Sequence, residues 1–111
     1  MGAFVRGEIV VLPFLSNLST MAQKRPVLVL AQVGRYNDLI VCMITAKPAE
    51  LSIEINEFDF DEGHLRNETS YVRPDRLFTA APTLIDRRVA ILKRSKMEEI
   101  LNQVQQIFSV E

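Results

Sequence analysis

The sequence is poor in the residues from which many catalytic and structural sites are built. It has one cysteine, Cys42, one histidine, His64, and no tryptophan. A single cysteine cannot form a disulfide within the chain, which fits a reducing compartment. Because Cys42 lies in an apolar run, we interpret it as a small buried hydrophobe and not as a nucleophile. A lone histidine and the absence of any C-x-x-C pair give no credible metal site, so we expect neither a metal nor another cofactor.

The motifs of several large enzyme classes are also missing. There is no glycine-rich phosphate loop and no G-x-S-x-G, which argues against P-loop and α/β-hydrolase chemistry. No apolar stretch is long enough to span a bilayer. The first residues, MGAFVRGEIVV, do not follow the order of a signal peptide. We therefore expect a cytoplasmic protein that does not bind membranes.

An excess of charge of one sign is absent as well. The formal net charge is −1, which argues against a protein that coats nucleic acid without selectivity. The charges are nevertheless segregated, because residues 50–62 hold six acids and no base, whereas residues 63–96 hold eight bases and three acids. Two interpretations stay open. The segments form two solvated surfaces of opposite sign, or part of the basic set faces a polyanion that the acidic segment shields or gates.

What the chain does contain is enough apolar residues for one core. Of its 111 residues, 48% are hydrophobic, which predicts a single domain over residues 1–111. Residues 9–14, 27–31 and 39–45 are short apolar runs of the kind found in buried strands. We expect residues 16–24 to form a loop and residues 34–38 a hairpin turn. Parallel strands need a longer crossover, so the strands are expected to be antiparallel and to form a small closed barrel.

The second half of the chain predicts shorter elements. Residues 51–55 alternate apolar and polar side chains, as a half-exposed strand does. Residues 56–68 are expected to form a long polar loop. Residues 70–73 and 77–79 are predicted as two short strands that Pro74 separates at an edge or a bend. Residues 88–92 are the last predicted strand.

The C-terminal segment has the clearest pattern, which predicts a helix from about Ser95 to Phe108. Ser95 and Glu98 match an S-x-x-E capping box. Apolar residues then follow at helical spacing and form one stripe. They are Met97, Ile100, Leu101, Val104, Ile107 and Phe108. The predicted fold is therefore mainly β, a small antiparallel barrel with a C-terminal α-helix.

Polar residues with chemical potential lie at the predicted strand ends. Lys24 and Arg25 precede the second strand, and Thr45 ends the third. In an antiparallel hairpin these two ends meet, so Arg25 and Thr45 are expected to be neighbours. Arginine binds phosphate bidentately, and a hydroxyl beside it completes a plausible phosphate site. The plainer alternative is that Arg25 pairs with an acid and Thr45 is an ordinary strand residue, and spacing alone favours that alternative.

Several segments together resemble the MazF/PemK family of toxins from type II toxin–antitoxin systems. The segments are R-G-E-I-V at residues 6–10, K-R-P-V-L-V-L at 24–30, I-T at 44–45 and S-Y-V-R-P-D-R-L-F-T at 70–79, followed by the helix. The resemblance implies an SH3-like barrel of the CcdB/MazF type and a homodimer. It also implies metal-independent cleavage of single-stranded RNA and a cognate antitoxin whose tail occupies the RNA groove.

Carried over to this sequence, the resemblance gives a set of site residues. Arg25 and Thr45 match the catalytic pair, and Ser70 matches a residue that lines the same site. Lys24, Lys47, Ser70 and Arg73 are the expected RNA-binding residues. The chain departs from the family at Ala46, where a small hydroxyl residue is common, and in the loop before Gln23, which lacks the usual glycine.

The implied chemistry needs little from the protein, because RNA supplies its own nucleophile, the 2′-hydroxyl. Arg25 would stabilise charge on the phosphorane and Thr45 would donate a hydrogen bond. Arginine is a poor proton acceptor, so no general base is assigned. His64 is interpreted as a solvated loop residue. The alternative function is a non-catalytic member of the same fold that acts by binding a protein, either a degenerate toxin or a gyrase poison similar to CcdB.

Overall fold

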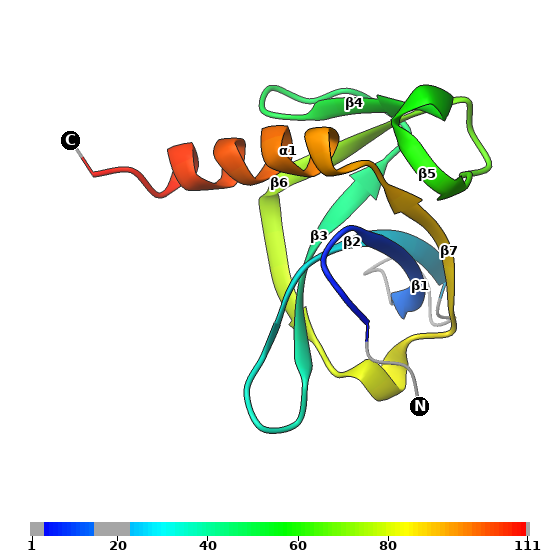
Figure 1. Cartoon of the computed structure of the whole chain (residues 1–111), viewed down its shortest axis with the longest axis vertical. Helices are drawn as coiled ribbons and strands as arrows, with labels where there is room; N and C mark the ends of the chain where they lie inside the picture. Colours follow the sequence, from blue (N-terminus) through cyan, green and yellow to red (C-terminus); the bar gives the residue numbers. More distant parts are fainter. Residues whose placement is uncertain (1–3, 15–22, 111) are drawn as a thin grey trace.

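The computed structural model describes residues 4–14 and 23–110, and these form a curled sheet with one helix beside it (Figure 1). In chain order the elements are β1 (Glu8–Phe14), β2 (Gln23–Val33), β3 (Asp38–Thr45), β4 (Ile53–Asn56), η1 (Glu57–Asp59), β5 (Phe60–Gly63), β6 (Thr69–Ala80), η2 (Pro82–Leu84), β7 (Arg87–Leu92) and α1 (Arg94–Ile107). Among the described residues, no helix is both long and apolar enough to cross a membrane.

The strands form one antiparallel sheet in the order β4-β6-β3-β2-β1-β7-β5. Its two outer strands, β4 and β5, are consecutive in the chain and are joined only by η1. The sheet therefore curls until its two edges come near each other, as the upper part of Figure 1 shows. The mainly β, antiparallel fold with a C-terminal helix is confirmed, and the barrel is nearly closed.

The hairpin between β2 and β3 follows the sequence prediction. Gly34 and Asn37 both have positive φ, 78° and 61°, and the Asn37 amide donates to the Gly34 carbonyl over 3.3 Å. Glycine and asparagine are the residues that adopt this conformation most readily. Of the predicted loop at residues 16–24, residues 16–22 lie outside the described part of the chain, and Gln23 and Lys24 already belong to β2.

Two apolar clusters lie on opposite faces of the central strands, which explains why these strands are apolar on both faces. Along β2, Leu28 and Leu30 point to one cluster, whereas Val27 and Val29 point to the other. The first cluster is covered by the start of α1 through Met97 and Ile100. The second is Val10, Leu12, Val27, Val29, Leu39, Val41 and Ala80, with Phe4, Phe14, Phe78 and Ile85 packed against it. Burying one such side chain stabilises the fold by about 1.5–3 kcal/mol.

The helix lies within one residue of its prediction, but its predicted cap is wrong. The N-cap residue is Lys93, which makes no side-chain capping hydrogen bond, and Ser95 is already inside the first turn. The backbone leaves the preceding strand β7 at Leu92 and turns at once into the helix, so the chain has no room for an extended Ser95. Packing of Met97 and Ile100 on the first cluster places the helix start instead.

The two short strands predicted on either side of Pro74 are one twelve-residue strand, β6. Pro74 is fully buried, and β6 lies between β3 and β4 instead of at the edge. The pairing jumps from Cys42–Leu77 to Met43–Arg73, so residues 74–76 form a bulge opposite β3. A bulge accommodates a residue without an N–H donor and bends the strand, and the bend of β6 is visible in Figure 1.

The long polar loop predicted at residues 56–68 is also wrong, because only residues 64–68 lack regular structure. Asn56 ends β4 and caps η1 by accepting from the Phe58 amide, while the Asp59 carboxylate accepts from the Asn56 amide. The next residues form the edge strand β5, which pairs with β7 from Phe60 to Gly63. An edge strand that exposes most of its side chains has no apolar alternation by which a sequence pattern could identify it.

Candidate functional site

A cleft of about 700 Å³ opens where three strand ends and one loop meet. The strand ends are the start of β2, the end of β3 and the start of β7, and the loop is residues 64–67. The residues that line the cleft are Val11, Lys24, Arg25, Pro26, Ile44, Thr45, Ala46, His64, Leu65, Arg66, Asn67, Ser70, Arg87 and Val89. We call this the β2–β7 cleft.

The sheet register brings Arg25 and Thr45 to this cleft. Val27 of β2 pairs with Met43 of β3, and the same register continued by two residues sets Arg25 opposite Thr45. Both side chains line the cleft. The hairpin geometry expected from the sequence therefore holds for these two positions.

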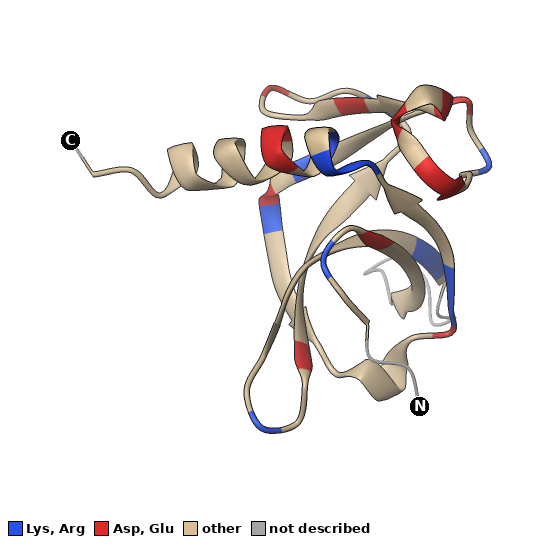
Figure 2. Ribbon diagram, viewed as in Figure 1, with Lys and Arg blue, Asp and Glu red and all other residues tan. Residues whose placement is uncertain are grey.

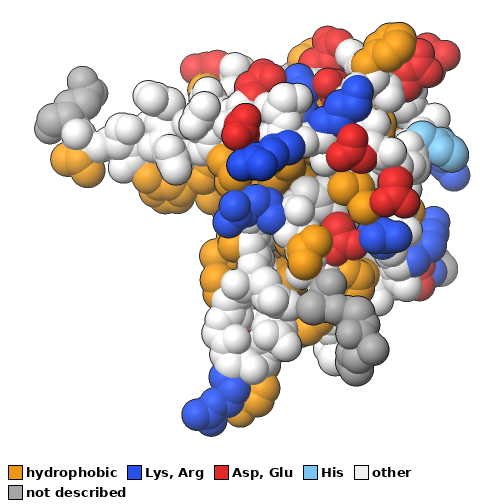
Figure 3. Space-filling model, viewed as in Figure 1, with side chains coloured by type: hydrophobic (Ala, Val, Ile, Leu, Met, Phe, Trp, Pro, Cys, Tyr) orange, Lys and Arg blue, Asp and Glu red, His pale blue; other side chains and the backbone are white. Residues whose placement is uncertain are grey.

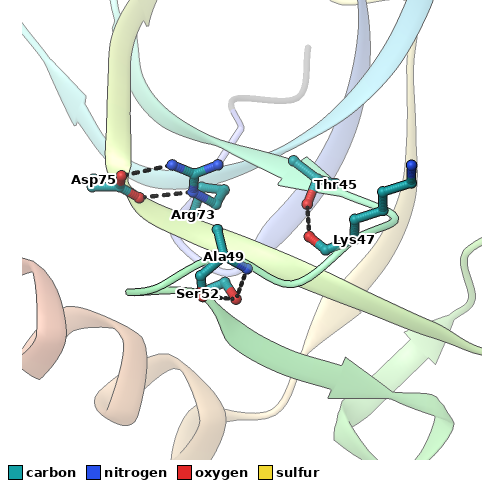
Figure 4. Close-up of polar contacts among 6 residues, drawn as sticks. All are labelled: Thr45, Lys47, Ala49, Ser52, Arg73 and Asp75. Atoms are coloured by element: carbon teal, nitrogen blue, oxygen red, sulfur yellow. Dashed lines mark hydrogen bonds and ion pairs between the residues drawn. The ribbon is translucent and has the colours of Figure 1, made fainter.

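Each member of this pair is hydrogen-bonded within its own strand end. The Arg25 Nη2 donates to Gln23 Oε1 over 2.9 Å, and the Thr45 Oγ1 donates to the Lys47 carbonyl oxygen over 2.7 Å (Figure 4). A threonine hydroxyl has only one proton. To donate to a bound phosphate, Thr45 must therefore rotate its O–H away from Lys47.

Lys24 and Ser70 lie in the cleft as expected. Ser70 is 5% exposed, whereas the Lys24 side chain is exposed and its Nζ lies 3.2 Å from Asp86 Oδ2. The same carboxylate oxygen accepts from Arg87 Nη1 over 2.7 Å. Hydrogen bonds from Lys24 and then from Arg87 lower the pKa of Asp86, so this carboxylate stays ionised and holds two cations at one side of the cleft.

The other two expected RNA-binding residues, Lys47 and Arg73, do not line the cleft. The Arg73 guanidinium donates two hydrogen bonds to Asp75, over 3.0 and 2.8 Å (Figure 4). This pairing lowers the pKa of Asp75 and raises the pKa of Arg73. RNA contact by Lys47 and Arg73 stays a prediction.

Four further residues of the cleft were not singled out as site residues from the sequence: His64, Arg66, Asn67 and Arg87. The position of Arg87 near the cleft follows from the way the strands pair. Val11 of β1 pairs with Pro26 on one side and with Arg87 on the other, so the start of β7 lies near the start of β2. The loop residues gave no such signal, because the neighbours of a loop depend on the folded chain.

The cleft concentrates positive charge in a chain whose net charge is −1. Lys24, Arg25, Arg66 and Arg87 line it, and none of the described lining residues is acidic. Acidic side chains gather instead over β4, η1 and β5, as Figures 2 and 3 show. Two of these cations, Arg66 and Arg87, belong to the basic segment 63–96, whereas no residue of the acidic segment 50–62 lines the cleft. That part of the basic set faces a polyanion stays a prediction.

The structure also shows the surroundings of Cys42 and the distribution of side chains that could bind a metal. Cys42 is fully buried, and burial raises the pKa of its thiol to about 12, so the interpretation as a buried hydrophobe is confirmed. Within residues 4–14 and 23–110, no three His, Cys, Asp or Glu side chains are grouped as metal ligands would be.

Comparison with known proteins adds a family and a fold. The model of the family described as "PemK-like, MazF-like toxin of type II toxin-antitoxin system" matches residues 5–108. A solved mycobacterial endoribonuclease in complex with its cognate antitoxin has the same fold, with a TM-score of 0.70 at 17% identity over 100% of this chain and 98% of that chain. The Mycobacterium tuberculosis toxin MazF-mt6 is similar, with a TM-score of 0.69 at 17% identity over 94% and 98%. No curated protein matches the sequence.

Proposed function

Because the chain belongs to the family of PemK-like, MazF-like toxins of type II toxin–antitoxin systems, we propose that it is an endoribonuclease that cuts single-stranded RNA without a metal. The observation that carries this proposal is the β2–β7 cleft. Arg25 and Thr45 lie together there with three further cationic side chains, and none of the described lining residues is acidic. Such a surface attracts the negatively charged phosphate backbone of RNA.

In the proposed reaction the 2′-hydroxyl of the RNA attacks the adjacent phosphate. The protein aligns the nucleophile with the phosphorus and stabilises the charge that develops on the phosphoryl oxygens. We assign Arg25 as the catalytic residue that stabilises this negative charge, because its guanidinium is permanently cationic and can donate two parallel hydrogen bonds. Thr45 donates a further hydrogen bond once its hydroxyl leaves the Lys47 carbonyl.

The direct test is cleavage of a mixed pool of single-stranded RNAs by the purified protein, freed of any antitoxin, in the presence of EDTA. We expect cleavage, and we expect Arg25→Ala to lower its rate by about a hundred- to a thousand-fold. Thr45→Ala should cause a smaller but clear loss, because it removes a neutral donor. Circular dichroism provides the control that both variants keep the fold. An inactive wild-type protein excludes the nuclease, and a fully active Arg25→Ala variant excludes the assigned site.

We also propose a cognate antitoxin as the protein partner. The mycobacterial structure of the same fold is a complex with its antitoxin, and a cationic cleft of this kind would accept an acidic peptide segment. The simplest check is the neighbouring reading frame, which should encode a small DNA-binding protein with an acidic tail. Co-expression of that protein should suppress RNA cleavage.

One feature favours the alternative of a non-catalytic protein on this fold. Both members of the proposed catalytic pair already have hydrogen-bond partners within the chain, Gln23 and Lys47. If these contacts persist when RNA is bound, the cleft would bind without cutting. RNA binding without cleavage at any sequence, measured on the same wild-type protein, would support this alternative.

A further inference from the structure

The one histidine of the chain lies at the β2–β7 cleft, and the backbone on both sides of it is fixed. His64 lines the cleft with an exposed side chain, pale blue in Figure 3. Before it, Gly63 pairs with Ala90 of β7. A Cβ at position 63 would lie 2.1 Å from the Val89 carbonyl oxygen, so the two strands meet more closely here than any side chain allows.

The residue after it is held as well. Leu65 is half-buried and packs against the first apolar cluster. His64 therefore sits between an anchored strand end and an anchored apolar side chain, and its imidazole projects from a backbone of defined position. His64 is an exposed loop residue, as the sequence predicted, and the structure adds that its backbone is anchored on both sides.

The chemistry of the cleft lacks one component that His64 can supply. The charged side chains that line the cleft are Lys24 and Arg25 from β2, Arg66 from the loop and Arg87 from β7. The carboxylate of Asp86 lies at its side, outside the lining, where Lys24 and Arg87 both bind it. Lysine and arginine side chains only donate hydrogen bonds. The neutral acceptors are the hydroxyls of Thr45 and Ser70 and the amide of Asn67, and none of these is basic enough to take a proton near neutral pH. Imidazole is the side chain that can.

We propose that His64 is the general base that removes the proton from the attacking 2′-hydroxyl, an assignment that rests on the proposed nuclease function. As the bond from the 2′-oxygen to phosphorus forms, the proton moves from the 2′-hydroxyl to the free imidazole nitrogen. The bond from phosphorus to the 5′-oxygen breaks, and that oxygen takes a proton from water. The imidazolium then gives its proton to the hydroxide left behind, so the products are a 2′,3′-cyclic phosphate and a 5′-hydroxyl, and the histidine is restored.

The cationic side chains have the complementary role in this step. Arg25 stabilises the phosphorane, while Lys24, Arg66 and Arg87 hold the flanking phosphates. Among the described residues that line the cleft, several cations can therefore stabilise negative charge, and His64 can take up a proton. Cleavage by an internal hydroxyl requires both functions.

The test compares wild-type protein with His64→Ala and His64→Gln on one RNA that the wild type cuts. We expect both variants to lower kcat by about a hundred- to ten-thousand-fold, with KM changed much less. We also expect the acidic limb of the pH–rate profile to disappear, and added imidazole to restore part of the activity of His64→Ala. Glu68→Gln is the matched control from the same loop, because Glu68 is exposed and does not line the cleft; its kcat should be unchanged.

A substrate with sulfur in place of the 5′-bridging oxygen separates a base from an acid, since a thiolate leaves without being protonated. If His64 is the base, His64→Ala stays slow on this substrate, whereas recovery of the wild-type rate would overturn the assignment. A wild type that cuts RNA while both His64 variants keep its rate and pH profile also overturns it and leaves the nuclease proposal standing. A wild type that cuts no RNA removes both.

Discussion

At the scale of single residues, the most constrained position beside the site is Gly63. Its φ is +74°, a region that residues with a Cβ rarely adopt. The close approach of Val89 to the position of its missing Cβ adds a second, independent requirement for glycine. Gly63 thereby fixes where the loop with His64, Arg66 and Asn67 begins.

Gly63→Ala is expected to destabilise the fold by at least about 2 kcal/mol, because it combines an unfavourable φ with a clash against backbone atoms that cannot move aside. Denaturant unfolding monitored by circular dichroism measures the change. Gly34→Ala provides the comparison, since Gly34 also has a positive φ but no atom of the described chain lies within 4 Å of the point that its Cβ would occupy. Its loss of stability should be smaller, and equal losses would contradict the role assigned to the strand contact.

At the scale of elements, the bulge in β6 brings Arg73 and Asp75 together. Residues 74–76 have no partners on β3. The side chains of Arg73 and Asp75, on either side of Pro74, form a bidentate pair. The pair thus holds Arg73 in a contact inside its own strand.

This pair predicts a pH dependence of stability. The Arg73 guanidinium lowers the pKa of Asp75, so the pair stabilises the folded chain above the ordinary aspartate pKa of about 3.9. That contribution is lost as the pH falls through the lowered pKa of Asp75. Asp75→Asn should lower the melting temperature at pH 7 by about 1–3 °C, because the pair is partly exposed. In thermal scans the difference from wild type should shrink as the pH falls below the ordinary aspartate pKa and towards the lowered pKa of Asp75. A difference that stays constant over this fall in pH would refute the ionic origin.

At the scale of the whole molecule, the arrangement of charge matters more than its sum. Four cations line the cleft, whereas a group of acids lies over β4, η1 and β5 (Figure 2). An RNA strand bound in the cleft should therefore release counterions locally although the protein is slightly acidic. Affinity should fall steeply with salt.

Arg87→Ala is expected to weaken binding to single-stranded RNA similarly for all sequences and to reduce the slope of log K against log salt by about 0.7. Arg35→Ala removes the same charge at the tip of the β2–β3 hairpin, at the other end of β2 from the cleft, and should leave the slope unchanged. Fluorescence anisotropy at several salt concentrations measures both slopes. Equal effects of the two variants would show that RNA responds to net charge and not to the cleft.

The family further predicts a homodimer. The outer half of α1 projects past the sheet (Figure 1), and the apolar residues near its end, Phe108 and Val110, are 65% and 95% exposed. A symmetric dimer would bury one self-complementary patch on each subunit. Sedimentation equilibrium at micromolar concentration should give twice the 12.6 kDa chain mass, and a monomer throughout that range would contradict the prediction.

Local patterns in the sequence determined those elements whose structure depends on near neighbours. Short runs rich in β-branched residues specified β1, β2, β3 and β7, because such side chains pack well on a pleated surface. Gly34 and Asn37 specified the hairpin turn, and an apolar stripe specified α1. The order of the motifs was enough to indicate the family. The short turn was enough to place Arg25 beside Thr45, since the register of a hairpin follows from its turn length.

Tertiary structure alone decided the features that depend on contacts between distant segments. The edge strand β5 exists because β7 offers a partner, the continuity of β6 through Pro74 depends on a bulge against β3, and the helix start is set by packing instead of by Ser95. The cleft is assembled from residues 11 to 89, with Arg66, Arg87 and His64 brought to Arg25 by the closing of the sheet. A sequence pattern reports the period of one element, whereas a site between elements is defined by how the curled sheet brings its ends together.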